Sequence, residues 1–386
     1  MASFAARTAW PRSENALSVA LSELRARGAA ILDLTASNPT QASLPYDAEG
    51  IVGALQTPAL LRYEPDPRGG AEARAAVADY YRRRGLTVDP SGLFLTASTS
   101  EAYGFLFRLL LNPGDRVLVP EPSYPLFDFL LDLADADRRR YRLAWDGAWY
   151  LDRQSLEEGL AGGAKLILLV SPNNPTGTVL SPSERDFVID RARHYGAAII
   201  SDEVFADFSA DHRAASLIGT SEVLGFSLSG LSKVAGLPQL KLGWIVPFGP
   251  SPEVTEAGAR LEIIADTFLS VSRAAEVAAP ALLALAEPWQ ASLRERLFDN
   301  RAELERQCRG TGLSVRPSGG GWSAVVDRPR HQGDEAFVLE LLREDLVLVH
   351  PGYFFDLLED GCLVVSLIPE PGRFQEGIRR LIARAR

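Results

Sequence analysis

The sequence predicts an α/β protein with a large domain, built on a mostly parallel sheet flanked by helices, and a smaller α+β domain. Between Gly92 and Val246, short apolar runs alternate with longer amphipathic stretches, which is typical of βα units. After Val246 the pattern changes to long helical stretches followed by short strands. The chain of 386 residues also exceeds the roughly 100–200 residues of an ordinary domain. We therefore expect two domains.

The strands expected in the large domain are apolar runs bounded by turn-forming residues. They are Leu93–Thr96, Arg116–Val119, Lys165–Val170, Ala197–Ser201, Val223–Leu228 and Leu242–Val246, with Arg138–Leu143 as a further candidate. Helical patterns lie between them at Glu101–Leu111 and Ser183–Tyr195. The second helix is preceded by a Ser-Pro-Ser-Glu sequence, which is a good capping cluster.

The smaller domain is expected from the remaining helices and strands. The helical stretches are Pro252–Ala284, Trp289–Arg309 and Arg373–Ala385, and the short strands lie near Gly321–Val326, Leu346–Val349 and Cys362–Leu367. Ile31–Thr35 resembles a strand, so we expect the N-terminal segment to join this domain. The resulting division is an N-terminal segment 1–45, a large domain 46–285 and a small domain 286–386.

Composition disfavours several classes of protein. Forty basic and fifty acidic side chains give a net charge of −10, which argues against nucleic acid as the main partner. The longest apolar stretches, Leu166–Val170 and Val277–Ala286, are shorter than the roughly 20 residues that span a membrane. The N-terminus lacks the apolar core of a secretory signal, so we expect a cytoplasmic protein. Two cysteines and four scattered histidines predict neither a disulfide framework nor a metal site.

Two polar motifs directly follow predicted strands. The first, Ser171-Pro-Asn-Asn-Pro-Thr-Gly177, follows Lys165–Val170, and taken alone it could be an ordinary turn. The second, Ser201-Asp202-Glu203, ends another apolar strand, where a carboxylate is often only a helix cap. Ligands bind at the carboxyl ends of strands in open α/β sheets, so both motifs are candidates for one cleft. There Asp202 would hold a proton on a cofactor nitrogen.

A third motif ends in a rare lysine. Ser227-Leu-Ser-Gly-Leu-Ser-Lys233 follows a predicted strand, and Lys165 and Lys241 are the only other lysines in the chain. A surface lysine normally needs no explanation. A lysine held in a cleft, however, can lose its proton and form a Schiff base with a carbonyl group.

The order Asn-Pro-Thr-Gly, Ser-Asp-Glu and Ser-Lys, with about thirty residues between motifs, resembles the class I/II aminotransferases. These are pyridoxal-phosphate enzymes of the aspartate-aminotransferase fold, also called fold type I. Further matching segments are Ser37-Asn38-Pro39, Tyr63 with Gly69, Pro122-Ser123-Tyr124-Pro125, Gly236-Leu237-Pro238 and Lys241-Leu242-Gly243-Trp244. The resemblance implies a transferase that moves an amino group from an amino acid or amine to a keto acid or carbonyl acceptor.

The resemblance also implies roles for single residues. Lys233 would form the Schiff base and later shuttle a proton between substrate and cofactor. Asp202 would keep the pyridine nitrogen protonated, so that the ring accepts electrons. Asn174 would donate to the phenolic oxygen of the cofactor, and Tyr124 would stack on its ring.

The cofactor phosphate needs hydrogen-bond donors. Ser98, Thr99 and Ser100 begin the helix Glu101–Leu111, and the positive end of a helix suits a dianion, although an ordinary cap would look the same. The resemblance implies that Ser232 and Lys241 complete this site. It also implies that Tyr63 reaches the neighbouring active site, which requires a homodimer.

The sequence departs from the family pattern around the cofactor. Phe205 stands where a tyrosine commonly donates to the phenolic oxygen, and Lys241 stands where an arginine is usual. Gly230 replaces a frequent phosphate-binding serine, so Ser229 or Ser232 would have to serve instead.

A further departure concerns the substrate. Val364 occupies the place of the arginine that grips the α-carboxylate in an Arg-x-Ser motif. Either another arginine enters the site, with Arg373 and Arg68 as candidates, or the substrate lacks that carboxylate. Neutral contacts to the substrate would then come from Asn174 and from the backbone near Asn38.

Two other functions compete with an aminotransferase. A pyridoxal-phosphate lyase or decarboxylase would share the fold. The substrate bond that is aligned with the π system of the cofactor is the one that breaks, so the same fold can support either reaction. A cofactor-binding regulator would need a basic DNA-binding extension, and the presence of both Lys233 and Asp202 disfavours it.

Overall fold

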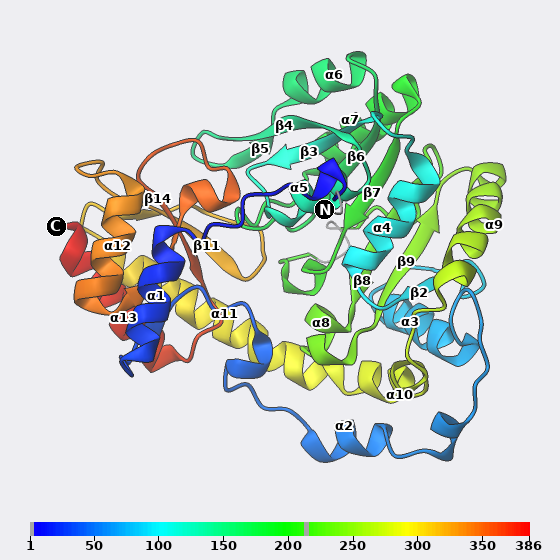
Figure 1. Cartoon of the computed structure of the whole chain (residues 1–386), viewed down its shortest axis with the longest axis horizontal. Coiled ribbons are helices and arrows are strands. Elements are labelled where there is room, and N and C mark those ends of the chain that lie inside the picture. Colours follow the sequence, from blue (N-terminus) through cyan, green and yellow to red (C-terminus); the bar gives the residue numbers. More distant parts are fainter. Residues whose placement is uncertain (1–3, 212–215) are drawn as a thin grey trace.

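A central sheet of eight strands organises the computed structural model, which describes residues 4–211 and 216–386 (Figure 1). The strand order is β2-β9-β8-β7-β6-β3-β4-β5. The strands are β2 Phe94–Thr96, β3 Arg116–Glu121, β4 Asp137–Trp145, β5 Trp149–Leu151, β6 Ala164–Val170, β7 Ala198–Asp202, β8 Gly225–Gly230 and β9 Gly243–Phe248. The neighbouring strands β8, β7, β6, β3 and β4 are all parallel, while β9 and β5 pair antiparallel. The expected mostly parallel sheet is therefore confirmed.

The apolar character of β6 follows from burial on both faces of the sheet. Leu166 and Leu168 pack on one face with residues of helices α4 and α9, whereas Ile167 and Leu169 pack on the other face with α6 and α7. A strand covered by helices on both sides reads as a continuous apolar run rather than an alternating one. This explains why the strand could be predicted from sequence.

Helices cover both faces of this sheet. They are α2 Ala48–Ala54, α3 Ala71–Arg83, α4 Thr99–Leu110, α5 Leu126–Leu133, α6 Arg153–Ala161, α7 Pro182–Tyr195, α8 Leu231–Val234, α9 Ser251–Phe268 and α10 Arg273–Ala284. A reciprocal capping box between Ser181 and Glu184 begins α7, as the sequence predicts. The expected single stretch Pro252–Ala284 is instead two helices, because Leu269 adopts a left-handed conformation with φ of 44° and ends α9.

A small unit packs beside the large sheet and lies on the left in Figure 1. Its strands form a two-stranded sheet, β1 Leu32–Asp33 with β12 Val347–Leu348, and a four-stranded sheet in the order β10 Ser314–Val315, β11 Ser323–Asp327, β14 Cys362–Ser366 and β13 His350–Pro351. Its helices are α1 Ala16–Ala26, α11 Ala286–Cys308, α12 Asp334–Asp345 and α13 Pro371–Ala385. The N-terminal strand pairs parallel with β12, so the N-terminal segment does join this unit.

Strand β14 presents its side chains alternately to two environments. Leu363 and Val365 enter the core formed with α11, α12 and α13. Cys362 and Val364 point to the opposite face, in a cluster with Val325. This alternation is the period of two of a β-strand. It places Val364 on the face that lines the cavity described below.

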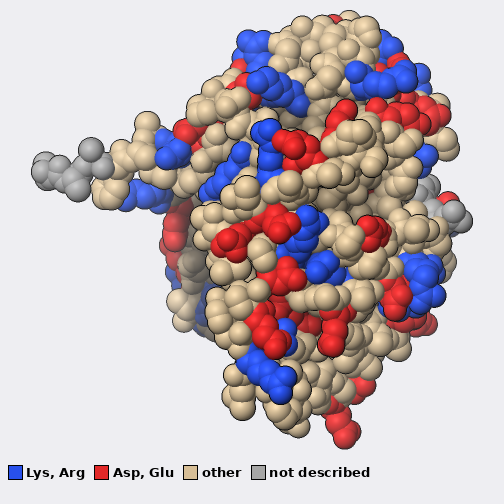
Figure 2. Space-filling model, turned by 90° about the vertical axis from the view of Figure 1, so that its right-hand side faces the viewer, with Lys and Arg blue, Asp and Glu red and all other residues tan. Residues whose placement is uncertain are grey.

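The described residues contain no helix long and apolar enough to cross a membrane. On the face shown in Figure 2, basic and acidic side chains are interspersed and form no continuous basic patch.

Candidate active site

The polar motifs meet in one cavity at the carboxyl ends of the central strands. The cavity has a volume of about 270 Å³. Asn174 follows β6, Asp202 ends β7, and Lys233 lies in α8 directly after β8. Carboxyl ends of adjacent parallel strands lie at the same edge of a sheet, so the three motifs converge as the sequence predicts.

Asp202 is buried and held by two hydrogen bonds. Its Oδ2 accepts from the Tyr103 hydroxyl at 3.0 Å, and its Oδ1 accepts from the Val204 amide at 3.2 Å. Burial raises the pKa of Asp202 to about 6, while these two donors and the charge of Lys233 act in the opposite direction. The carboxylate is thus costly to keep charged until a cationic partner joins it.

Lys233 is partly buried among aromatic rings. Its Nζ lies 4.5 Å from the centroid of the Trp322 ring and 5.5 Å from that of Phe205. Burial lowers the pKa of Lys233 to about 8, and the charge of Asp202 opposes this shift. A lower pKa increases the fraction of neutral amine, which is the form that attacks a carbonyl.

One end of the cavity is formed by the N-terminus of α4. Ser98 caps this helix and accepts a hydrogen bond from the Glu101 amide at 3.2 Å, and Ser98 and Thr99 line the cavity. The amide groups of a first helical turn have no partner within the helix, and they point toward a bound anion. This end therefore offers donors to a phosphate.

Two paired glycines bring strands β8 and β9 close to that helix end. A Cβ atom on Gly243 would lie 3.1 Å from the Thr99 amide nitrogen, and one on Gly230 would lie 2.9 Å from the Leu242 carbonyl oxygen. Neither distance leaves comfortable room for a side chain. Glycine at both positions thus keeps the anion-binding end compact.

The loop after β6 is fixed against the small unit. Asn173 Oδ1 accepts from the Thr176 hydroxyl at 2.9 Å, which holds the turn together. Gly177 has φ of 67°, and a Cβ there would lie 2.3 Å from the Gly320 carbonyl oxygen. Only glycine fits this approach. Asn174, between these anchors, faces the cavity.

Comparison with known proteins identifies the family. A family model described as aminotransferase class I and II matches residues 30–381. The chain belongs to this family.

Individual relatives agree with that assignment. Glutamate-pyruvate aminotransferase AlaA of Haemophilus influenzae is 26% identical over 93% of this chain and 91% of its own length. LL-diaminopimelate aminotransferase of Moorella thermoacetica is 26% identical over 94% and 92%. Among solved structures, a mutant of Thermus thermophilus aspartate aminotransferase matches with a TM-score of 0.86 at 22% identity, covering 100% of both chains. The fold is fold type I.

The chain is thus a pyridoxal-phosphate-dependent aminotransferase, and the lyase and regulator hypotheses are set aside. The cavity fits this cofactor. A buried carboxylate shares the cavity with a lysine, and a helix N-terminus there offers donors for a phosphate. These groups match a pyridine nitrogen, an aldehyde and a phosphate respectively.

The structure brings most predicted site residues of the aminotransferase together. Those lining the cavity are Ser98, Thr99, Tyr124, Asn174, Asp202, Ser232 and Lys233. The predicted residues outside its lining are Ser100, Ser229, Lys241, Asn38 and Tyr63. Of these, Asn38 accepts hydrogen bonds from the amide and hydroxyl of Thr40, and Lys241 is exposed. Tyr63 is 81% exposed in a separate groove that also contains Glu64 and Arg273.

The lining residues that sequence reasoning missed include Tyr103, Trp322 and His350. Tyr103 lies on an otherwise apolar face of α4, where its hydroxyl needs a partner, so a signal existed. Trp322 and His350 belong to the small unit, and their place in the cavity depends on how the two units pack.

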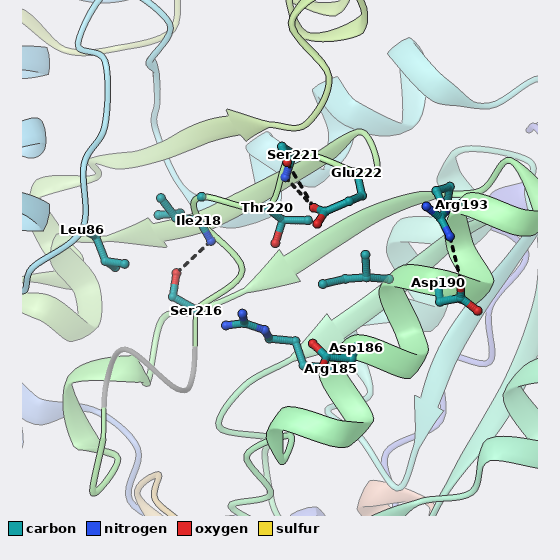
Figure 3. A pocket seen from close by; sticks show the side chains of 12 residues that line it. Leu86, Arg185, Asp186, Asp190, Arg193, Ser216, Ile218, Thr220, Ser221 and Glu222 are labelled. Carbon is teal, nitrogen blue, oxygen red and sulfur yellow. Dashed lines mark hydrogen bonds and ion pairs between the residues drawn. The ribbon is translucent and has the colours of Figure 1, made fainter.

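A second depression, of about 660 Å³, lies along α7 and the loop that leads into β8 (Figure 3). Some of its charged groups have local partners, as in the 2.9 Å contact of Arg193 with Asp190 and the 2.8 Å hydrogen bond from the Ser221 amide to Glu222. None of the predicted site residues is among those lining it. Chemistry, rather than size, therefore identifies the active site.

Proposed function

We propose that this aminotransferase is a cytoplasmic homodimer in which Lys233 and Asp202 carry the chemistry and Asn174 positions the cofactor. One observation carries the assignment of residues: the lysine and the buried carboxylate share one cavity with the N-terminus of α4. The reaction moves an amino group from a donor to a keto acid or carbonyl acceptor.

Pyridoxal phosphate, when bound, supplies a sink for the electrons left behind when a proton leaves the donor carbon. Lys233 would hold the cofactor through its Nζ, and the same nitrogen would move the proton away from the donor carbon. Its lowered pKa suits this work, because a general base functions best near the operating pH.

Asp202 would keep a proton on the ring nitrogen of the cofactor through its buried negative charge. Tyr103 and the Val204 amide orient the carboxylate. Ser98, Thr99 and Ser232, which line the cavity, would supply donors to the phosphate. Asn174 would donate to the phenolic oxygen, and Tyr124, which lines the cavity, would cover the ring.

Exposed side chains support the dimer. Tyr63 is 81% exposed and Leu61 is 90% exposed, so this segment has apolar surface that a partner subunit would cover. Tyr63 would then reach the neighbouring active site. We also propose the domain limits 1–45, 46–285 and 286–386, which is supported by the shared core of Leu17 and Leu34 with helices α11 to α13.

The test uses borohydride, which fixes the cofactor irreversibly on the lysine that holds it. Holoenzyme is reduced, digested and mapped by mass spectrometry. We expect the label on Lys233 alone, and the exposed Lys165 and Lys241 serve as internal controls. A label on either control, or no label on any lysine, would refute the assignment.

A further inference from the structure

The wall that faces the lysine from the small unit has an unusual composition for this family. Val364 lines the cavity, and its direct cross-strand neighbours are Val325 on β11 and His350 on β13. Directly opposite residues of antiparallel strands point to the same face of a sheet. The position where the family pattern places a carboxylate-binding arginine is therefore an apolar side chain beside an imidazole.

No arginine replaces the missing one among the described residues that line the cavity. Arg373 donates instead to the Ile31 carbonyl oxygen at 2.8 Å. Arg68 donates to Glu262 and to the Ser91 carbonyl oxygen, both at 2.8 Å. Both candidates raised by the sequence thus lie outside the lining, with their guanidinium groups bonded to other partners.

His350 is a polar cross-strand neighbour of Val364 on this wall. Its ring packs against Phe354 and Phe355, with centroids 5.7 and 5.6 Å apart. Its Nδ1 is buried and has no hydrogen-bond partner among the described residues. Burial lowers the pKa of His350, although the charge of Asp33 opposes this shift, so the ring is neutral at physiological pH. A neutral imidazole offers one donor and one acceptor, which suits an uncharged group.

The rest of this wall has no charged side chain among the described residues that line the cavity. The lining includes the apolar Leu126, Val204, Trp322, Phe355 and Ile368 and the hydroxyl-bearing Thr35, Ser37, Ser323 and Ser366. A carboxylate placed here would lose its water without gaining a cationic partner, which is unfavourable. An apolar amine with an uncharged polar group would lose much less hydration free energy on entering the cavity.

We propose that the amino donor of this enzyme has no carboxylate on its reacting carbon, and that His350 hydrogen-bonds an uncharged hydroxyl or carboxamide in its place. The proposal rests on the proposed function and names its donor class, an apolar primary amine. In this half-reaction the C–N bond of the donor is replaced by a C=O bond whose oxygen comes from water. The nitrogen stays on the cofactor, whose aldehyde carbon takes up the two electrons, so no other oxidant is required.

The first experiment compares three matched donors: phenylalaninol, phenylalaninamide and phenylalanine. Holoenzyme is mixed with each, and loss of the absorbance of the aldehyde form is followed in a single turnover. We expect the two neutral donors to have rate-to-dissociation-constant ratios at least about tenfold above that of phenylalanine, because a bidentate arginine is missing. A higher ratio for phenylalanine would overturn the proposal.

A second experiment separates recognition from chemistry. The ligands 3-phenylpropanol and 3-phenylpropionate carry no amine, so they report only on binding, and calorimetry with holoenzyme gives their dissociation constants. Tighter binding of the alcohol supports the proposal, and tighter binding of the acid overturns it. Failure of every donor, including glutamate and alanine, to change the absorbance would refute the aminotransferase assignment of the site, while this binding comparison would still decide the donor class.

Variants assign the effect to residues. His350→Phe should weaken 3-phenylpropanol binding by about tenfold, as expected for one lost hydrogen bond, while His350→Asn, which keeps a polar group, should retain most of it. Val364→Arg should reverse the preference toward 3-phenylpropionate. Arg373→Ala is the control and should leave both ligands unaffected, with retained cofactor absorbance showing that each variant is folded. Loss of acid binding in Arg373→Ala, or unchanged alcohol binding in His350→Phe, would refute the role of His350.

Discussion

At the scale of single residues, the active site depends on two side chains whose pKa values burial shifts in opposite directions. Burial makes the Asp202 carboxylate harder to ionise and the Lys233 amine easier to deprotonate. Tyr103 favours the ionised form of Asp202, because its hydroxyl donates to the carboxylate at 3.0 Å. Tyr103 thus helps to maintain the negative charge on Asp202 that the cofactor ring requires.

Removing this hydroxyl should weaken the cofactor site. In Tyr103→Phe we expect the pKa of Asp202 to rise and cofactor affinity to fall by roughly fivefold to tenfold, the usual effect of one hydrogen bond. Affinity is measured by titrating cofactor-free protein with pyridoxal phosphate. The matched control is Tyr141→Phe, because the buried Tyr141 hydroxyl donates to the Leu168 carbonyl oxygen at 2.9 Å and Tyr141 is not among the residues that line the cavity. Equal affinity in both variants would contradict the role given to Tyr103.

The lowered pKa of Lys233 should be visible without catalysis. In cofactor-free protein, trace labelling with acetic anhydride reports the neutral fraction of each lysine. At a pH below its pKa of about 8, Lys233 is protonated and unreactive. We therefore expect its labelling to rise with a midpoint near pH 8. A midpoint for Lys233 near the ordinary lysine value of about 10.4 would contradict the shift.

At the scale of elements, much of the fold follows from the sequence because the central strands are buried on both faces. Apolar runs such as β6 and β7 could be predicted, and with them the strand ends that carry Asn174, Asp202 and Lys233. The break at Leu269 could not, since a leucine gives no signal for a left-handed conformation. Nor could His350, because only the antiparallel register of β13 with β14 brings it beside Val364.

Gly230, which pairs with Gly243, shows how an element can depart from its family pattern for steric reasons. Gly230→Ser would restore the family residue, yet its Cβ would meet the Leu242 carbonyl oxygen at 2.9 Å. We expect a loss of roughly 1–3 kcal/mol in stability, seen as a lower Tm, together with weaker cofactor binding. Gly53→Ser in α2 is the control, because no atom lies within 4 Å of a Cβ there. Tighter cofactor binding at unchanged Tm would show that the backbone accommodates the side chain.

At the scale of the whole molecule, the exposed Tyr63 predicts that each active site needs two chains. Mixing Lys233→Ala with Tyr63→Phe tests this, because a hybrid dimer would contain one site with both defects and one site with neither. We expect each parent to be impaired and the mixture, after subunit exchange, to regain activity up to about half of the wild-type value per site. Mixtures no more active than their parents would place Tyr63 in its own subunit.

The pairing of β1 with β12 has a consequence for synthesis on the ribosome. Leu32 pairs with Val347, so the first strand leaves the exit tunnel about 300 residues before its partner, which takes roughly 15–60 s at usual elongation rates. During that time α1 lacks α12, the helix on which it packs in the folded protein. The strands of the large sheet, the last of which ends at Phe248, can already assemble. The wall that includes His350 and Val364 is made last. The half of the enzyme that holds the cofactor is therefore translated before the half that selects what reacts with it.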